Sequence, residues 1–207
     1  MRGYKMIAEV TAILGMTVLL GGCGKSDTVD ATTITVHKNG SVDSVILEEF
    51  EKDYYDEEEL NTMVTETIAT YNRENGDKKI KLQDVSVNNG IASSIMTYQD
   101  AIDYASFNEE IFFSGTVAEA YDEGFDFDVQ LTKATTKSPS EDTGTPETIT
   151  KNDILTMGSM HIVIAEAPVH IRTYKNITYI SENVSMVNEK EVIITSNGEQ
   201  PAYILFQ

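Results

Sequence analysis

Residues 56–98 read DEEELNTMVTETIATYNRENGDKKIKLQDVSVNNGIASSIMTY, and this stretch decides the fold class. In its first half, apolar side chains recur at helical spacing. Asp56 is followed three residues later by Glu59, the pattern of a capping box, and Asn75-Gly76 supplies a stop signal. We therefore expect an amphipathic helix over Glu57–Arg73 that buries one stripe, formed by Leu60, Met63, Val64, Ile68 and Tyr71.

The second half of the stretch predicts two antiparallel strands joined by a turn at Asn88-Asn89-Gly90. Apolar residues alternate along the outgoing strand but change phase near Asp84, which indicates a β-bulge. A three-residue loop would pair Val87 with Ile91, Leu82 with Met96, and Ile80 with Tyr98.

A second hairpin is predicted upstream of the helix. Two apolar segments, Ile34–Val36 and Val42–Leu47, flank Asn39-Gly40, and this dipeptide is the strongest short hairpin signal. With those two residues at the turn, Ile34 would lie opposite Val45.

Downstream of residue 98 the helical signals are short. Residues 97–107 predict one short helix, and Thr116 with Glu119 repeats the capping-box pattern for another, which Gly124 would end. After it, apolar residues alternate strictly with polar ones, which predicts a half-buried strand. The alternating residues are Phe125, Phe127, Val129 and Leu131.

Residues 133–150 are rich in Thr, Ser, Pro, Glu and Asp and predict a disordered loop. Beyond them the chain predicts six short strands arranged as an antiparallel meander. These strands are expected at His161–Ala165, Val169–Arg172, Ile177–Ser181, Val184–Val187, Glu191–Thr195 and Ala202–Phe206.

Together these elements predict an α+β fold of antiparallel strands and hairpins, with one main amphipathic helix and one or two short helices. The expected divisions are an α+β region at 32–132, the loop at 133–150 and a β-rich region at 151–207. The β-rich region would either complete the same domain or form a small second unit.

The N-terminus carries a secretory signal, with Arg2 and Lys5 before an apolar run that ends in Leu20-Gly21-Gly22-Cys23. This order resembles the lipobox of bacterial lipoproteins. The resemblance implies that residues 1–22 are a signal peptide and that Cys23 receives a diacylglycerol thioether and palmitate. Residues 23–31 would then be a polar tether, of which the last eight reach at most about 26 Å. We expect a protein outside the cytoplasm, held at the cell membrane.

Charge and cysteine content exclude several functions. Without residues 1–22 the chain carries 13 basic and 33 acidic side chains, a formal charge of about −20. Such a chain repels nucleic acid and anionic lipid. Cys23 is the only cysteine, so a lipidated chain would have no disulfide, thiolate nucleophile or cysteine-bound metal.

The candidate metal ligands are few. Asp122, Asp126 and Asp128 surround Gly124 and offer oxygen ligands to calcium, but a solvated strand face predicts the same pattern. His161 and His170 flank Pro168 and, with Glu166, could form a three-ligand zinc site if their strands were neighbours. We expect no cofactor.

Catalytic patterns are equally sparse. Ser159 follows Gly158, but Met157 and His161 occupy the glycine positions of the G-x-S-x-G motif. Ser159, a histidine and a carboxylate could still meet across the fold. Glycosidases usually bind sugar rings on aromatic side chains, and this chain has no tryptophan. The tyrosines that remain as possible stacking surfaces are Tyr54, Tyr55, Tyr98, Tyr104 and Tyr121.

Two further stretches resemble small uncharacterised lipoproteins of gut clostridia. One is Phe50–Asn72 with Tyr54-Tyr55-Asp56, and the other is Tyr104–Leu131 with Gly124-Phe125-Asp126-Phe127-Asp128. No functional residue carries over from that resemblance. We expect a membrane-anchored binding or interaction protein, with a protein or glycan as ligand. The alternatives are a hydrolase of envelope or dietary polymers and an accessory subunit of a membrane complex.

Overall fold

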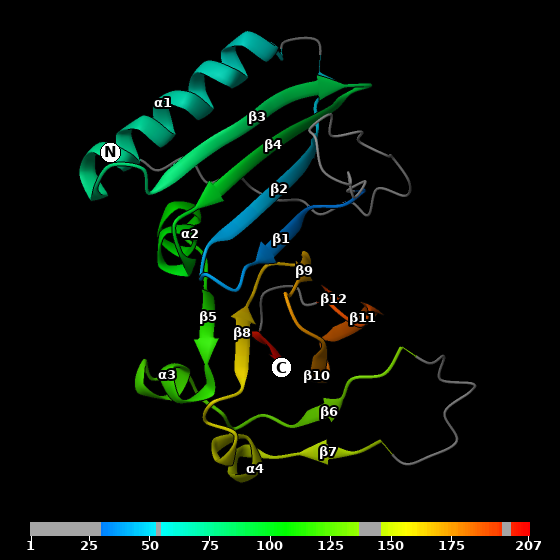
Figure 1. Cartoon of the computed structure of the whole chain (residues 1–207). Coiled ribbons are helices and arrows are strands. Elements are labelled where there is room, and N and C mark those ends of the chain that lie inside the picture. Colours follow the sequence, from blue (N-terminus) through cyan, green and yellow to red (C-terminus); the bar gives the residue numbers. More distant parts are fainter. Residues whose placement is uncertain (1–29, 53–54, 137–145, 196–199) are drawn as a thin grey trace.

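The computed structural model describes residues 30–52, 55–136, 146–195 and 200–207. Within these residues the chain has the α+β fold expected from the sequence, with four helices and two sheets of mostly antiparallel strands (Figure 1). None of the helices in these ranges is both long enough and apolar enough to cross a membrane.

The larger sheet has seven strands in the order β11-β12-β9-β1-β2-β4-β3. Neighbouring strands are antiparallel except for β1 and β9, which run parallel. Its strands are β1 (Thr33–Val36), β2 (Val42–Glu49), β3 (Ile80–Asn88), β4 (Ile91–Tyr98), β9 (His170–Arg172), β11 (Val184–Asn188) and β12 (Glu191–Ile194).

The smaller sheet has six antiparallel strands in the order β5-β8-β13-β10-β6-β7. Two of its inner strands, β8 and β13, are almost wholly apolar and buried. Its strands are β5 (Phe112–Thr116), β6 (Leu131–Lys133), β7 (Thr148–Ile149), β8 (His161–Ala165), β10 (Ile177–Ile180) and β13 (Ala202–Phe206).

Two hydrophobic cores cover the two faces of the smaller sheet. Along β8, Val163 and Ala165 belong to the first core, whereas Ile162 and Ile164 belong to the second. The first core is shared with the larger sheet and with two helices, and the second is closed by the other two. The helices of the first core are α1 (Glu57–Asn75) and α2 (Ala101–Asn108), and those of the second are α3 (Val117–Asp122) and α4 (Lys151–Thr156).

The predicted main helix is confirmed as α1, which runs along β3 (Figure 1). The Asp56 carboxylate accepts a hydrogen bond from the Glu59 N–H at 2.9 Å, so it caps the helix. Ile68 is buried, but Met63 is 49% exposed, so its place in the buried stripe was predicted wrongly. The helix packs against β3 at the edge of the sheet, so only a narrow row of helix side chains is buried.

Side chains of α1 also protect β3, which is an edge strand of the larger sheet. The Asn72 amide accepts the Ile80 N–H at 2.9 Å and donates to the Ile80 carbonyl at 2.8 Å. At the other end of the strand, the Glu57 carboxylate accepts the Val87 N–H at 3.2 Å. Because unpaired edge groups invite pairing with other chains, these contacts remove a site of aggregation.

The bulge predicted near Asp84 in the β3–β4 hairpin is confirmed, because the register shifts between Leu82 and Asp84. The pairs of Ile80 and Leu82 are as predicted, but Val87 pairs with Ala92 and not with Ile91. The bulge takes up one extra residue of β3, so the loop has two residues, Asn89-Gly90, in place of the predicted three. Both of these residues have positive φ, 51° and 77°, as a type I′ turn requires.

In the first hairpin the predicted register is wrong by one residue, because Ile34 pairs with Ser44. The loop has three residues, 38–40, and closes with a hydrogen bond from the Gly40 N–H to the His37 carbonyl at 3.0 Å. Gly40 has a φ of 89°, the backbone that such loops need at this position. The shift turns Ser44 toward the core in place of Val45.

The start of the helix predicted over residues 97–107 is wrong. Residues 97 and 98 belong to β4, and α2 begins only at Ala101, where the Asp100 carboxylate accepts the Asp103 N–H at 2.9 Å. The capping box of Thr116 and Glu119 is confirmed at the start of α3.

The strand predicted over residues 125–131 is wrong, because β6 begins only at Leu131. The burial does alternate, with Phe127 buried between the exposed Asp126 and Asp128. However, the Asp128 N–H donates to the Asp126 carboxylate at 2.9 Å, and the Val129 N–H donates to the Phe127 carbonyl at 2.7 Å. These local bonds replace a ladder with a neighbouring strand.

The loop predicted over 133–150 is wrong at both ends. Leu131 pairs with Ile149 between β6 and β7, and the Lys133 amine lies 2.7 Å from the Glu147 carboxylate. Thr150 begins α4, a helix that the sequence analysis did not predict. Residues 137–145 lie outside the described part of the chain.

All six C-terminal strands are present, but the predicted meander is wrong. β8, β10 and β13 belong to the smaller sheet, whereas β9, β11 and β12 belong to the larger one. Strands β8 and β13 are apolar on both sides and therefore need a core on each face. In β9, by contrast, only Ile171 enters the core between two polar neighbours.

We expect Ile68→Ala to lower the free energy of unfolding by about 2–5 kcal/mol, because it leaves a cavity under α1. Met63→Ala is the matched control on the same helix and should cost less than about 0.5 kcal/mol. Urea denaturation followed by circular dichroism measures both. Equal losses would contradict the placement of the helix face.

Asn72→Ala should destabilise the protein by about 1–2 kcal/mol, because two hydrogen bonds to the β3 edge are lost. It should also raise the tendency to aggregate, measured by light scattering during prolonged incubation. Asn75→Ala, which removes only a bond to the Tyr71 carbonyl of the same helix, is the control. Similar aggregation of the two variants would show that Asn72 does not guard the edge.

Candidate functional site

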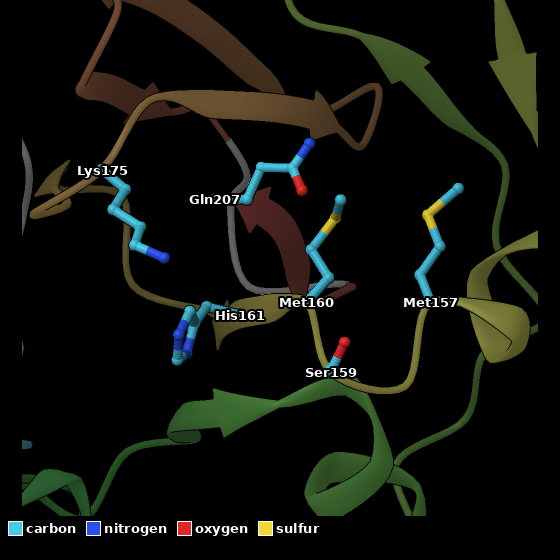
Figure 2. A pocket seen from close by; sticks show the side chains of 6 residues that line it. All are labelled: Met157, Ser159, Met160, His161, Lys175 and Gln207. Atoms are coloured by element: carbon cyan, nitrogen blue, oxygen red, sulfur yellow. The ribbon is translucent and has the colours of Figure 1, made fainter.

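A hollow of about 320 Å³ lies at one end of the smaller sheet, where β8 begins and β13 ends. We call it the β8 hollow. Its lining comes from the turn after α4, the first residue of β8, the segment before β10 and the residue after β13. The lining residues are Met157, Ser159, Met160, His161, Lys175 and Gln207 (Figure 2).

The hollow has a cationic and an apolar side. In Figure 2 the Lys175 amine and the His161 ring lie on one side of the view, and the Met157 side chain lies on the other. The Met160, Ser159 and Gln207 side chains stand between them. Both methionines pack against the second core, so the apolar side continues the interior of the protein.

Aromatic packing holds the His161 ring. The ring stacks on Phe206 with a centroid distance of 5.5 Å and a tilt of 24°, and Tyr174 meets it edge-on at 5.5 Å. His161 pairs in the sheet with Phe206 and with Thr116. The imidazole is therefore fixed by its neighbours on the sheet.

The acidic residue that interacts electrostatically with His161 is Glu119. Hydrogen bonds from the backbone and hydroxyl of Thr116 lower the pKa of Glu119, and the charge of His161 adds a smaller lowering effect. These bonds are both 2.8 Å long and belong to the cap of α3. The Glu119 carboxylate is thus already engaged in the helix cap.

Ser159 and His161, which the sequence analysis considered as parts of a catalytic set, do line the same hollow. Within the described residues, no hydrogen bond joins them and no carboxylate belongs to the lining. The arrangement offers contacts to a ligand: a cation, an imidazole, a hydroxyl, an amide and two thioethers.

His170 lies elsewhere, on β9 of the larger sheet, so the strands of His161 and His170 are not neighbours. The His170 Nδ1 is 2.9 Å from the Glu191 carboxylate, and the Arg172 guanidinium is 3.1 Å from the same group. Burial alone would raise the pKa of Glu191, but hydrogen bonds from His170 and Arg172 and their charges outweigh it and lower the pKa.

The face of the larger sheet that carries Glu191 and Arg172 has a row of polar residues that runs across the strands from β12 to β3. Directly opposed residues share a face of a sheet, and the strand registers place Glu191, Arg172, Thr35, Asp43, Thr97 and Lys81 in one line. Within this row Asp43 accepts hydrogen bonds from Thr97 at 2.7 Å and contacts the His37 Nε2 at 2.8 Å.

The proposed metal ligands are not brought together. Asp122, Asp126 and Asp128 are all exposed, and Asp126 faces the Lys151 amine at 3.4 Å. Hydrogen bonds from the Asp128 backbone and from Lys151 lower the pKa of Asp126. In the part of the chain that the structure describes, no three histidine, cysteine or acidic residues form a group that could hold a metal ion.

Some of the tyrosines considered as stacking surfaces are buried and others are exposed. Tyr98 and Tyr104 are buried and meet each other edge-on at 5.0 Å, so they belong to the core. Tyr55 stacks on Phe50 at 4.6 Å, and Tyr121 is 55% exposed. Tyr54 and Cys23 lie outside the described residues.

Sequence reasoning missed most of the β8 hollow. Met157, Met160, Lys175 and Gln207 form no motif, because they meet only through the pairing of β8 with β13 and the chain turn before β10. The one available signal was the local run Gly158-Ser159-Met160-His161. Comparison of the chain with family models, curated proteins and solved structures finds no match.

Glu191→Gln should lower the free energy of unfolding at neutral pH and change how this free energy depends on pH. Because the folded-state pKa of Glu191 is lowered, its charge stabilises the fold above the unfolded pKa of about 4.3. This contribution disappears as the pH falls through the folded-state value. Urea denaturation at pH 7 and pH 3 should show a gap between parent and variant that narrows in acid. The exposed Glu182→Gln is the control, and a pH-independent gap would contradict the role of the charge.

Proposed function

We propose that this protein is a lipid-anchored binding protein that works outside the cytoplasm, with Cys23 as its membrane anchor and the β8 hollow as its binding site. The anchor is supported by the basic start, the apolar run and the Gly21-Gly22-Cys23 ending. The binding role is supported by one observation above others: side chains from three separate segments, residues 157–161, Lys175 and Gln207, line one hollow.

The distance from anchor to fold also supports the proposal. Strand β1 begins at Thr33, ten residues after Cys23, and a chain of that length reaches at most about 35 Å. The folded part would therefore stay near the bilayer surface. Two acyl chains hold a protein at a membrane far more strongly than one, since each buried CH₂ adds about 0.8 kcal/mol.

The lining of the hollow favours binding over hydrolysis. Aromatic rings hold His161 on the sheet, and the thioethers of Met157 and Met160 supply flexible apolar contacts. Nucleophilic hydrolysis through a serine needs the nucleophile, a base and an orienting group in one constellation. The hollow instead offers separate contact groups around a space for a small ligand.

Cys23→Ser should abolish incorporation of labelled palmitate in a bacterial host and should release the protein from the membrane fraction. Ser26→Ala, which changes the tether and keeps Cys23, is the matched control and should label and fractionate as the parent does. A Cys23→Ser protein that still carries label, or that pellets as tightly as the parent, would refute the anchor.

The hydrolase alternative is tested separately, with glycan, peptide and ester substrates. Turnover that disappears in Ser159→Ala and His161→Ala, while both variants keep their thermal midpoint, would replace the binding role by catalysis. An accessory role would instead show as stable co-purification with one membrane complex after crosslinking.

A further inference from the structure

We infer that the β8 hollow binds a small amphiphilic anion, an aliphatic chain of about eight carbons that ends in a carboxylate. This inference rests on the proposed binding role and names the class of ligand. Three properties of the hollow carry it: its size, the charge on one side and the thioethers on the other.

The size of the hollow limits the ligand. Its volume of about 320 Å³ lies at the low end of small-molecule sites. At about 30 Å³ for each water-sized group, it holds about ten non-hydrogen atoms. A carboxylate with an eight-carbon chain has that number and would fill the hollow.

The charge of the hollow selects an anion. Several basic side chains of this acidic chain face carboxylates: Lys79 contacts Asp103, Lys133 contacts Glu147, and Arg172 contacts Glu191. Lys175 has no acidic partner among the described residues, and no acidic residue lines the hollow. An ammonium group beside an imidazole, in a chain of net charge −19, is a local site for a negative group.

Met157 on the far side of the hollow and Met160 in its centre suit an aliphatic chain. Met157 and Met160 are half-buried, and both pack against the second core. Their unbranched thioether side chains adapt to an irregular apolar ligand. The Ser159 hydroxyl and the Gln207 amide lie between the two sides (Figure 2), where they can donate hydrogen bonds to the carboxylate.

The experiment uses methionine methyl groups as reporters, because Met157 and Met160 line the hollow and Met63, Met96 and Met186 lie outside it. Full-length protein with ¹³C-labelled methionine methyls is titrated with octanoate. We expect saturable shifts of the Met157 and Met160 signals, while the Met63 and Met96 signals serve as internal references and stay in place.

Variants test the two sides of the hollow. Lys175→Met keeps the length of the side chain, removes the charge and should weaken octanoate binding about tenfold or more. Lys175→Arg should keep most of the affinity. Lys81→Met removes the same charge from β3 in the other sheet and is the matched control. Met160→Asn should weaken octanoate more than acetate, since it removes apolar contact.

Ligand controls decide the chemistry. The neutral 1-octanol and the cationic octylammonium should bind at least tenfold more weakly than octanoate. Equal binding of octanol, tighter binding of octylammonium, absence of saturable shifts, or equal shifts of the Met157, Met160 and reference signals would each overturn the inference. Because these measurements do not depend on Cys23, a failure here leaves the anchor test intact, and a failed anchor test leaves the ligand assignment intact.

Discussion

The pairing of β8 with β13 is the interaction on which the rest of the structure depends. The two strands match residue for residue from Ala165 with Ala202 to His161 with Phe206. Their side chains enter both cores in alternation, so the pair forms an apolar plate inside the protein. Removing this plate would expose both cores at once, because its side chains lie in each of them.

This plate also explains why the candidate site lies where it does. Apolar side chains fill the middle of both strands, and the hollow lies where these strands end. His161 and Gln207 stand at that end, and the turn after α4 brings the two methionines beside them. Lys175 lies in the segment that precedes β10. The site is therefore a consequence of strand ends meeting, as binding sites at sheet edges often are.

In the larger sheet, unlike the smaller one, one face is apolar and the other is polar. One face contributes to the first core through residues such as Ile34, Tyr98 and Ile171. The other carries the polar row, in which the buried Glu191 carboxylate is satisfied by His170 and Arg172. A buried carboxylate without such partners would be costly, so the row ties β12 to β9 and thereby to the parallel partner β1.

Local features of the fold were predictable from the sequence because they depend on residues a few positions apart. The cap at Asp56, the bulge near Asp84 and the capping box at Thr116 all belong to this class. The register of the first hairpin was missed by one residue, since the loop type depends on how Gly40 closes the turn. The strand expected at residues 125–131 was missed because a ladder needs a partner that periodicity does not reveal.

By itself, the sequence determined the α+β class and most of the element boundaries, since spacing and turn chemistry are local properties of a chain. Only the tertiary structure decided that β1 lies beside β9, that the C-terminal strands divide between two sheets, and that Lys175 lines the same hollow as Met157 and Met160. These contacts join residues far apart in the chain. They are selected by the burial of apolar faces on both sides of β8 and β13, which is a property of the whole fold.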